Sequence, residues 1–133
     1  MSQKLASLII ATLAFCGAVL AEDKKSPDGA THVKAEEAGK LVKEGKVAVL
    51  DVRTADEYKD GHIKGAKNID FTENNFESEA AKLDKSKPYL VHCQGGGRST
   101  KSLEVLKKLG FQHIYHLDGG FSAWEKAGQP LEK

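Results

Sequence analysis

The chain has few of the residues that cross-link small proteins or interrupt regular structure. It contains 2 cysteines, Cys16 and Cys93, and only 3 prolines among 133 residues. A disulfide framework is therefore excluded, and so is the composition of a collagen-like or disordered chain. Charge is balanced as well, with 20 basic and 19 acidic residues. No strong field therefore attracts nucleic acid, and no nucleic-acid partner is expected.

Charged residues are missing altogether from one stretch near the N-terminus. Residues 5–21 carry no charge, follow Lys4, and end abruptly at a polar segment. Val19 and Ala21 lie at positions −3 and −1 of a cut after Ala21, a pattern typical of a secretory signal peptide. We therefore predict that residues 1–21 are a signal peptide. A retained membrane anchor is the alternative, because 17 uncharged residues approach the length that spans a bilayer.

Cleavage of this signal would leave an exported, periplasmic domain with a single cysteine. Lys4 and Cys16 leave with residues 1–21, so equal numbers of acidic and basic residues remain. The polar residues 22–30 are expected to be a flexible leader, followed by one domain over 31–131. No membrane contact is expected of this mature form. An unpaired thiol in an oxidising compartment calls for a chemical explanation.

Helical and strand patterns alternate along the rest of the chain. Residues 47–52 and 89–93 are nearly continuous apolar runs, typical of strands buried on both faces. A third strand pattern covers 112–117. The alternation predicts parallel strands joined by helical crossovers, hence an α/β domain with a mainly parallel sheet and helices on both faces. The predicted helices cover 34–43, 54–58, 73–83, 99–109 and 121–126.

A cysteine stands where the second apolar run ends, directly before a glycine-rich loop. Cys93 and Asp51 both lie at the carboxyl ends of predicted strands, the edge where ligands bind in such sheets. Three glycines let backbone N–H groups curl around a bound anion, and a helix that begins near Ser99 adds its positive end. Arg98 adds a permanent charge. We predict a nucleophilic thiolate in a loop made of Cys93, Gln94, Gly95, Gly96, Gly97, Arg98 and Ser99.

The length of this loop bears on the reaction. Four residues separate Cys93 from Arg98, whereas cysteine phosphatases have a longer loop that wraps a tetrahedral phosphate. A shorter loop forms a narrower cradle, which suits one sulfur atom better than a whole oxyanion. A cysteine phosphatase or arsenate reductase of related shape stays open as a less favoured alternative.

Four ordered motifs follow one another along residues 31–131. They are Asp51-Val52-Arg53 with Glu57-Tyr58, Gly61-His62-Ile63-Lys64-Gly65-Ala66 with Asn68-Ile69, the loop from Cys93 to Ser99, and Leu117-Asp118-Gly119-Gly120-Phe121 with Ala123-Trp124. Together these motifs resemble the rhodanese-like domain family. A single short domain behind a signal peptide is similar to the small exported bacterial thiosulfate sulfurtransferases of that family. The resemblance implies a three-layer rhodanese-like fold.

The resemblance implies sulfur transfer in two steps. Cys93 would take the outer sulfur of thiosulfate as a persulfide and pass it to a thiophilic acceptor, cyanide or a thiol. Backbone N–H groups from Gln94 to Ser99 would hold the sulfur, and Arg98 would help to hold the anionic donor. Neither a metal nor an organic cofactor is implied, and small sulfur compounds are the expected partners. A persulfide carrier that serves a protein acceptor, with little turnover of its own, is the alternative.

Other motif residues are expected to support the site without taking part in the chemistry. Asp51, Arg53 and Glu57 are predicted to form a charge and capping network beneath the active edge. The His92 side chain should point away from the cysteine, because neighbours on a strand face opposite sides. Gly119–Gly120 is predicted to make a tight backbone approach near the site.

Overall fold

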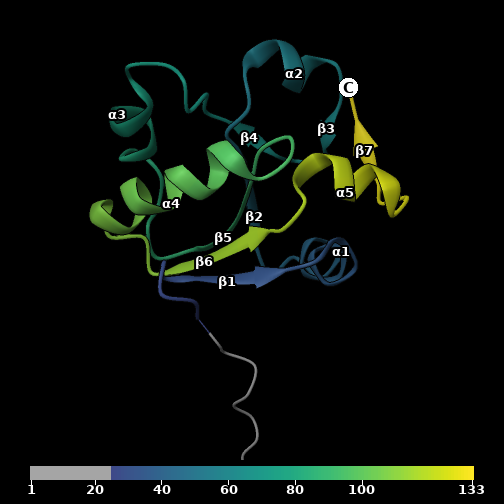
Figure 1. Ribbon diagram of the computed structural model, residues 1–133, viewed down its shortest axis with the longest axis horizontal. Helices are drawn as coiled ribbons and strands as arrows, with labels where there is room; N and C mark the ends of the chain where they lie inside the picture. The colour runs from purple at the N-terminus through teal and green to yellow at the C-terminus, as the bar shows by residue number, and fades with distance from the viewer. Residues whose placement is uncertain (1–24) are drawn as a thin grey trace, which may run out of the picture.

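A five-stranded parallel sheet forms the centre of the molecule. The computed structural model describes residues 25–133, so the predicted signal peptide lies outside the described residues. The strand order is β1-β6-β5-β2-β4, and each neighbouring pair runs parallel (Figure 1). A separate antiparallel pair joins β3 to β7. The strands are β1 Ala30–Val33, β2 Ala48–Asp51, β3 His62–Ile63, β4 Lys67–Asn68, β5 Pro88–His92, β6 His113–Leu117 and β7 Leu131–Glu132.

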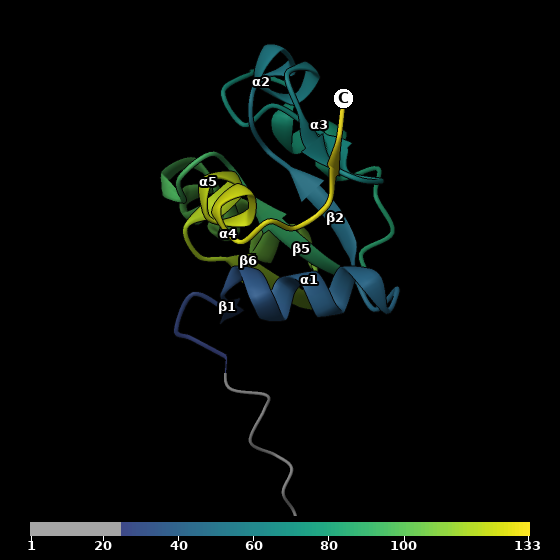
Figure 2. The same cartoon turned by 90° about the vertical axis from the view of Figure 1, so that its right-hand side faces the viewer.

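Helices cover the main sheet in two groups. Helices α3 and α4 contact each other, and so do α1 and α5. In the side view, α1 and α5 lie toward the viewer and α3 lies behind the strands (Figure 2). The helices are α1 Ala35–Lys43, α2 Ala55–Lys59, α3 Phe76–Ala80, α4 Gly97–Leu109 and α5 Gly120–Lys126.

The alternation of side chains along each strand divides the core into two clusters. On β5, Leu90 packs in the cluster that contains Ala38 of α1 and Trp124 of α5. The next residue, Val91, packs in the other cluster with Leu106 of α4. Successive strand residues face opposite sides of the sheet, so an apolar run such as β5 supplies both cores at once. The predicted mainly parallel α/β fold with helices on both faces is confirmed.

The predicted elements have the observed order, but one helix is shorter and four strands are new. The expected helix over 73–83 is reduced to Phe76–Ala80. Upstream, the Asp70 carboxylate accepts hydrogen bonds from the backbone N–H and the hydroxyl of Thr72, a local turn that competes with helix. The strands β1, β3, β4 and β7 have two to four residues each, too short for a recognisable period.

The first strand begins slightly earlier than the predicted domain. Ala30 opens β1 and is fully buried, whereas the domain was expected from residue 31. Before it, Ser26 and Gly29 form a hydrogen-bonded turn, with the Gly29 N–H donating to the Ser26 carbonyl. The boundaries 22–30 and 31–131 stay predictions. Among residues 25–133, no helix is both long and apolar enough to cross a membrane.

Candidate active site

Cys93 lies at the carboxyl end of β5, directly before the loop that leads into α4. It is the only cysteine of the described residues and its side chain is almost wholly buried. The Gly96 N–H donates to Sγ at 3.1 Å, and the Ser99 hydroxyl lies 3.3 Å from the same atom. Burial raises the pKa of the Cys93 thiol, but the hydrogen bonds from Ser99, Gly96 and Gly95 together lower this pKa by more than burial raises it. The net shift of the thiol pKa is therefore downward. These contacts favour the thiolate form of Cys93 over the thiol.

The three glycines of the loop have open space where a side chain would stand. Gly95 and Gly97 are exposed, and a side chain added at either would meet nothing within 4 Å. Only Gly96 needs its glycine for backbone conformation, because its φ is 123°. Gly97 begins the 13-residue helix α4, whose positive end therefore faces the loop. The glycine-rich loop and the start of the helix thus lie directly after Cys93, where we predicted them.

Arg98 does not stand free above the loop, because Glu57 holds it. Its two terminal nitrogens donate to the two carboxylate oxygens of Glu57 at 2.7 and 3.0 Å. The same carboxylate accepts from the Thr54 N–H, and Thr54 caps α2 in the predicted capping box. The hydrogen bond from Arg98 lowers the pKa of Glu57 to about 2. We expected Glu57 to form a network with Asp51 and Arg53. Instead, Glu57 ties the Cys93 loop to α2.

Asp51 and Arg53 form a separate, buried ion pair beneath the loop. The Arg53 guanidinium donates to both carboxylate oxygens of Asp51, and it lies 4.1 Å from the centre of the Phe121 ring. It also donates to Gln94 Oε1 at 3.1 Å. The Gln94 amide in turn donates to the Ser122 hydroxyl. The side chain of Gln94 is thus engaged by the scaffold, which leaves its backbone for contact with a bound group.

The start of α5 packs against the start of the Cys93 loop. The Phe121 N–H donates to the Cys93 carbonyl at 2.9 Å, and the Ser122 N–H donates to the Gln94 carbonyl at 3.1 Å. A Cβ on Gly120 would lie 2.6 and 2.7 Å from these two carbonyl oxygens. The tight approach predicted at Gly119–Gly120 is therefore present.

His92 has the structural role that strand alternation predicts. It is fully buried, its ring stacks toward Phe121, and its Nδ1 lies 3.0 Å from the Cys93 carbonyl oxygen. Burial lowers the pKa of His92, which keeps the ring neutral. Its side chain faces the opposite side of the sheet from Cys93 Sγ.

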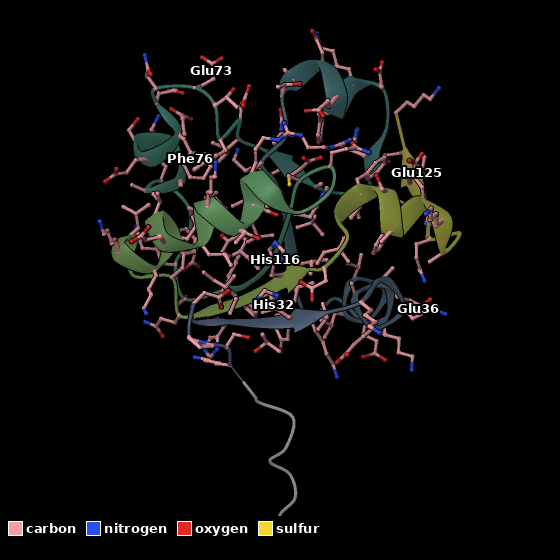
Figure 3. The ribbon with its side chains drawn as sticks, viewed as in Figure 1. His32, Glu36, Glu73, Phe76, His116 and Glu125 are labelled. Carbon is pink, nitrogen blue, oxygen red and sulfur yellow. The ribbon has the colours of Figure 1, made fainter. Side chains whose placement is uncertain are left out.

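A group of polar side chains that the sequence did not single out lies behind Ser99. His116 Nε2 is 2.7 Å from the Ser99 hydroxyl oxygen, and His116 Nδ1 is 2.9 Å from Asp118 Oδ1. His32 joins the group from β1, next to β6 (Figure 3). His32, His116 and Asp118 bring nitrogen and oxygen atoms within 4.8 Å of one another. These atoms already bind one another, so the group is fully accounted for as a hydrogen-bonded chain.

Comparison with known proteins decides the family. The profile described as "Rhodanese-like domain" matches residues 34–127. The chain belongs to the rhodanese-like domain family. A rhodanese-like domain of the Alr3790 protein from Anabaena sp. superimposes with a TM-score of 0.68 at 30% identity, covering 76% of this chain and 77% of that one.

Two curated relatives of this rhodanese-like domain differ greatly in length. "Thiosulfate sulfurtransferase GlpE" of Coxiella burnetii is 39% identical over 94 residues, which cover 71% of this chain and 85% of the relative. "Probable adenylyltransferase/sulfurtransferase MoeZ" of Mycobacterium tuberculosis is 35% identical over 116 residues. That match covers 87% of this chain but only 30% of MoeZ, so the chain spans about a third of that relative's length.

Sequence reasoning reached the loop of this rhodanese-like domain but not its long-range partners. The structure brings Cys93, Gly96 and Ser99 together as predicted, and it holds Arg98 beside them. Reasoning from the sequence missed His116. The alternation of side chains along its strand could have placed His116 on an inward face, two residues before Asp118. No local signal indicated that β1 would bring His32 to the same place, because the two strands are far apart in the chain.

Proposed function

We propose that this rhodanese-like sulfurtransferase moves the outer sulfur of thiosulfate to a thiophilic acceptor through a persulfide on Cys93. The observation that carries the proposal is the set of donors that converge on Cys93 Sγ, from the Gly96 N–H and the Ser99 hydroxyl. These donors stabilise a thiolate before the reaction and the persulfide anion after it. No second cysteine of the described residues competes for the sulfur.

The reaction needs two displacements at sulfur. The Cys93 thiolate attacks the outer sulfur of thiosulfate, a new S–S bond forms, and sulfite leaves with the electrons of the broken bond. An acceptor nucleophile then attacks the outer sulfur of the persulfide, and Cys93 leaves as a thiolate. The GlpE relative, whose name includes thiosulfate sulfurtransferase, supports this choice of donor.

The ion pair between Arg98 and Glu57 defines how Arg98 takes part. Because both carboxylate oxygens of Glu57 are bound, Arg98 contributes a positive charge that is largely balanced within the protein. Its main action is to hold the loop against α2. A dianion such as thiosulfate would therefore be bound mostly by the N–H groups of the loop and by the end of α4.

Intact-mass spectrometry after incubation with thiosulfate tests the proposal. The expected result is a gain of one sulfur atom on the wild-type protein, reversed by cyanide and absent in Cys93→Ser. Cys93→Ser keeps the size of the residue, so its circular dichroism spectrum should match that of the wild type. A wild-type protein that gains no sulfur would refute the proposal. So would Cys93-dependent turnover of a phosphotyrosine analogue, which would favour the phosphatase alternative.

A persulfide carrier is the second candidate, and the similarity to MoeZ favours it. The name of MoeZ joins sulfurtransferase to adenylyltransferase, which suggests a protein that hands sulfur onward. Steady-state turnover with thiosulfate and cyanide separates the two. A stoichiometric persulfide with very slow turnover indicates a carrier, whereas rapid turnover indicates the enzyme.

We also propose that the protein is exported to the periplasm after cleavage behind Ala21. The uncharged residues 5–21 and the small residues before the cut support this. Fractionation of cells that express the full chain, with N-terminal sequencing of the product, tests it. A product that begins at Glu22 is expected, and an uncleaved chain in the membrane fraction would contradict export by cleavage.

A further inference from the structure

A line of hydrogen-bonding side chains leads from the Cys93 sulfur toward the protein surface. The Ser99 oxygen lies 3.3 Å from Cys93 Sγ and 2.7 Å from His116 Nε2. On the far side of the ring, His116 Nδ1 lies 2.9 Å from Asp118 Oδ1. Cys93, Ser99 and His116 are buried, whereas the Asp118 side chain is half exposed. The sulfur transfer described above makes no use of His116 or Asp118.

The outer part of the line carries charge. His32 Nδ1 lies 2.7 Å from the same Asp118 oxygen, and His32 Nε2 lies 2.9 Å from Asp28 Oδ2. Burial lowers the pKa of His32, but the bonds to Asp118 and Asp28 together raise this pKa by more than burial lowers it. The net shift of the His32 pKa is therefore upward. A ring with a carboxylate on each nitrogen is a protonated one. Two carboxylates and one imidazolium leave a net negative charge beside His116.

The partners of His116 determine where its protons sit. An ionised carboxylate only accepts hydrogen bonds, so His116 Nδ1 carries a proton and donates it to Asp118. In the neutral ring, Nε2 is then an acceptor that faces the Ser99 hydroxyl. That hydroxyl has one proton and three acceptors within reach, namely His116 Nε2 at 2.7 Å, the Gly96 carbonyl at 3.1 Å and Cys93 Sγ at 3.3 Å. While Cys93 is still a thiol, the shortest contact takes this proton, and the Ser99 hydroxyl donates to Sγ once Cys93 is a thiolate.

We propose that His116 accepts the Cys93 proton through the Ser99 hydroxyl, with Asp118 holding the ring in place. The S–H bond of Cys93 breaks and its proton goes to the Ser99 oxygen, while the original Ser99 proton goes to His116 Nε2. The products are a thiolate, a hydroxyl that now donates to the thiolate, and an imidazolium that donates to Asp118 and Ser99. Every polar atom in the line is then paired. The same hydroxyl would stabilise Cys93 again when it leaves the persulfide.

This inference rests on Cys93 being the nucleophile of the proposed function, but it can be tested without sulfur transfer. The titratable groups that face His116 come from three neighbouring strands and from the turn before β1. They are Asp118 on its own chain segment, His32 on β1 with Asp28 before it, and Cys93 at the end of β5, while His92 lies on the other side of the sheet. Among the described residues, the Ser99 hydroxyl of α4 is the neutral hydrogen-bond partner of His116.

The rate of Cys93 alkylation by iodoacetamide, followed across pH, measures the thiolate directly. In His116→Gln, where no base remains, the rate should fall about ten-fold at pH values below the thiol pKa, which corresponds to a shift of one unit. At high pH the rates should converge, because the thiol then ionises without help. Asp118→Asn should shift the profile in the same direction. His113→Gln, an exposed histidine on the same strand, is the matched control and should leave the profile unchanged.

A double-mutant cycle shows whether His116 acts through Ser99. Ser99→Ala alone should shift the profile upward, and adding His116→Gln to it should cause no further shift. If His116→Gln shifts the profile equally in the wild type and in Ser99→Ala, the relay is overturned. A wild-type profile in a folded His116→Gln protein would also overturn it. If that variant fails to fold, a wild-type profile in Asp118→Asn overturns it. Loss of persulfide formation with these profiles intact would instead refute the proposed function.

Discussion

Replacing Gly120 with alanine should push apart the two segments that form the base of the Cys93 loop. Two separate costs arise. The φ of Gly120 is 63°, and a left-handed conformation costs about 1–2 kcal/mol for a residue with a Cβ. The new Cβ would also lie 2.6 and 2.7 Å from the Gln94 and Cys93 carbonyl oxygens, which are backbone atoms and cannot rotate away. Overpacking of this kind costs about 1–3 kcal/mol.

A second glycine in the same conformation separates the two costs. Gly128 has a φ of 71°, but a Cβ there would meet nothing within 4 Å. Gly128→Ala should therefore show only the conformational cost, about 1 kcal/mol after the stabilising loss of freedom in the unfolded chain. Gly120→Ala should lose about 2–4 kcal/mol, since both costs apply.

Urea unfolding measures the difference between the two variants. With slopes of about 1–3 kcal/mol per molar, the midpoint of Gly120→Ala should lie roughly 1 M below that of Gly128→Ala. The displaced Cys93 carbonyl should also slow persulfide formation in Gly120→Ala, whereas Gly128→Ala should form the persulfide at the wild-type rate. Equal midpoints for the two variants would show that the loop yields to the added methyl group, and the reasoning from close approach would be wrong.

Two further predictions concern the ion pairs beneath the loop. The folded pKa of Glu57 is about 2 against an ordinary 4.5, so its pairing with Arg98 stabilises the fold above pH 4.5 and is lost as the pH falls toward 2. The pair is partly exposed, so Glu57→Gln should remove about 1 kcal/mol at neutral pH and flatten the stability profile between pH 4.5 and 2. An unchanged profile in chemical denaturation would contradict this. Arg53→Met should cost about 3–5 kcal/mol of stability, because it leaves the Asp51 charge buried without a partner. Combining Arg53→Met with Asp51→Leu should regain most of this lost stability. A double variant as unstable as the single one would argue against an unpaired charge as the cause.

Much of the architecture follows from local patterns in the sequence. Apolar runs at 47–52 and 89–93 need cover on both faces, so they predict buried parallel strands and helical crossovers. The capping box of Thr54 with Glu57 depends on residues three apart, and it forms as predicted. The loop around the candidate nucleophile was also predictable, because its glycines and Ser99 lie within six residues of Cys93 and depend on local backbone geometry.

Only the tertiary structure decided what each charged or titratable side chain meets. Glu57 and Arg98 are 41 residues apart, and His32 and Asp118 are 86 apart. A local pattern carries no information on such pairs, because strand order alone brings β1 beside β6 and α2 beside the start of α4. The sequence by itself therefore determined the fold class and indicated Cys93 as the candidate nucleophile. Folding decided that Glu57 restrains Arg98 and that a line from Ser99 to Asp28 stands behind the sulfur, since both depend on contacts across the sheet.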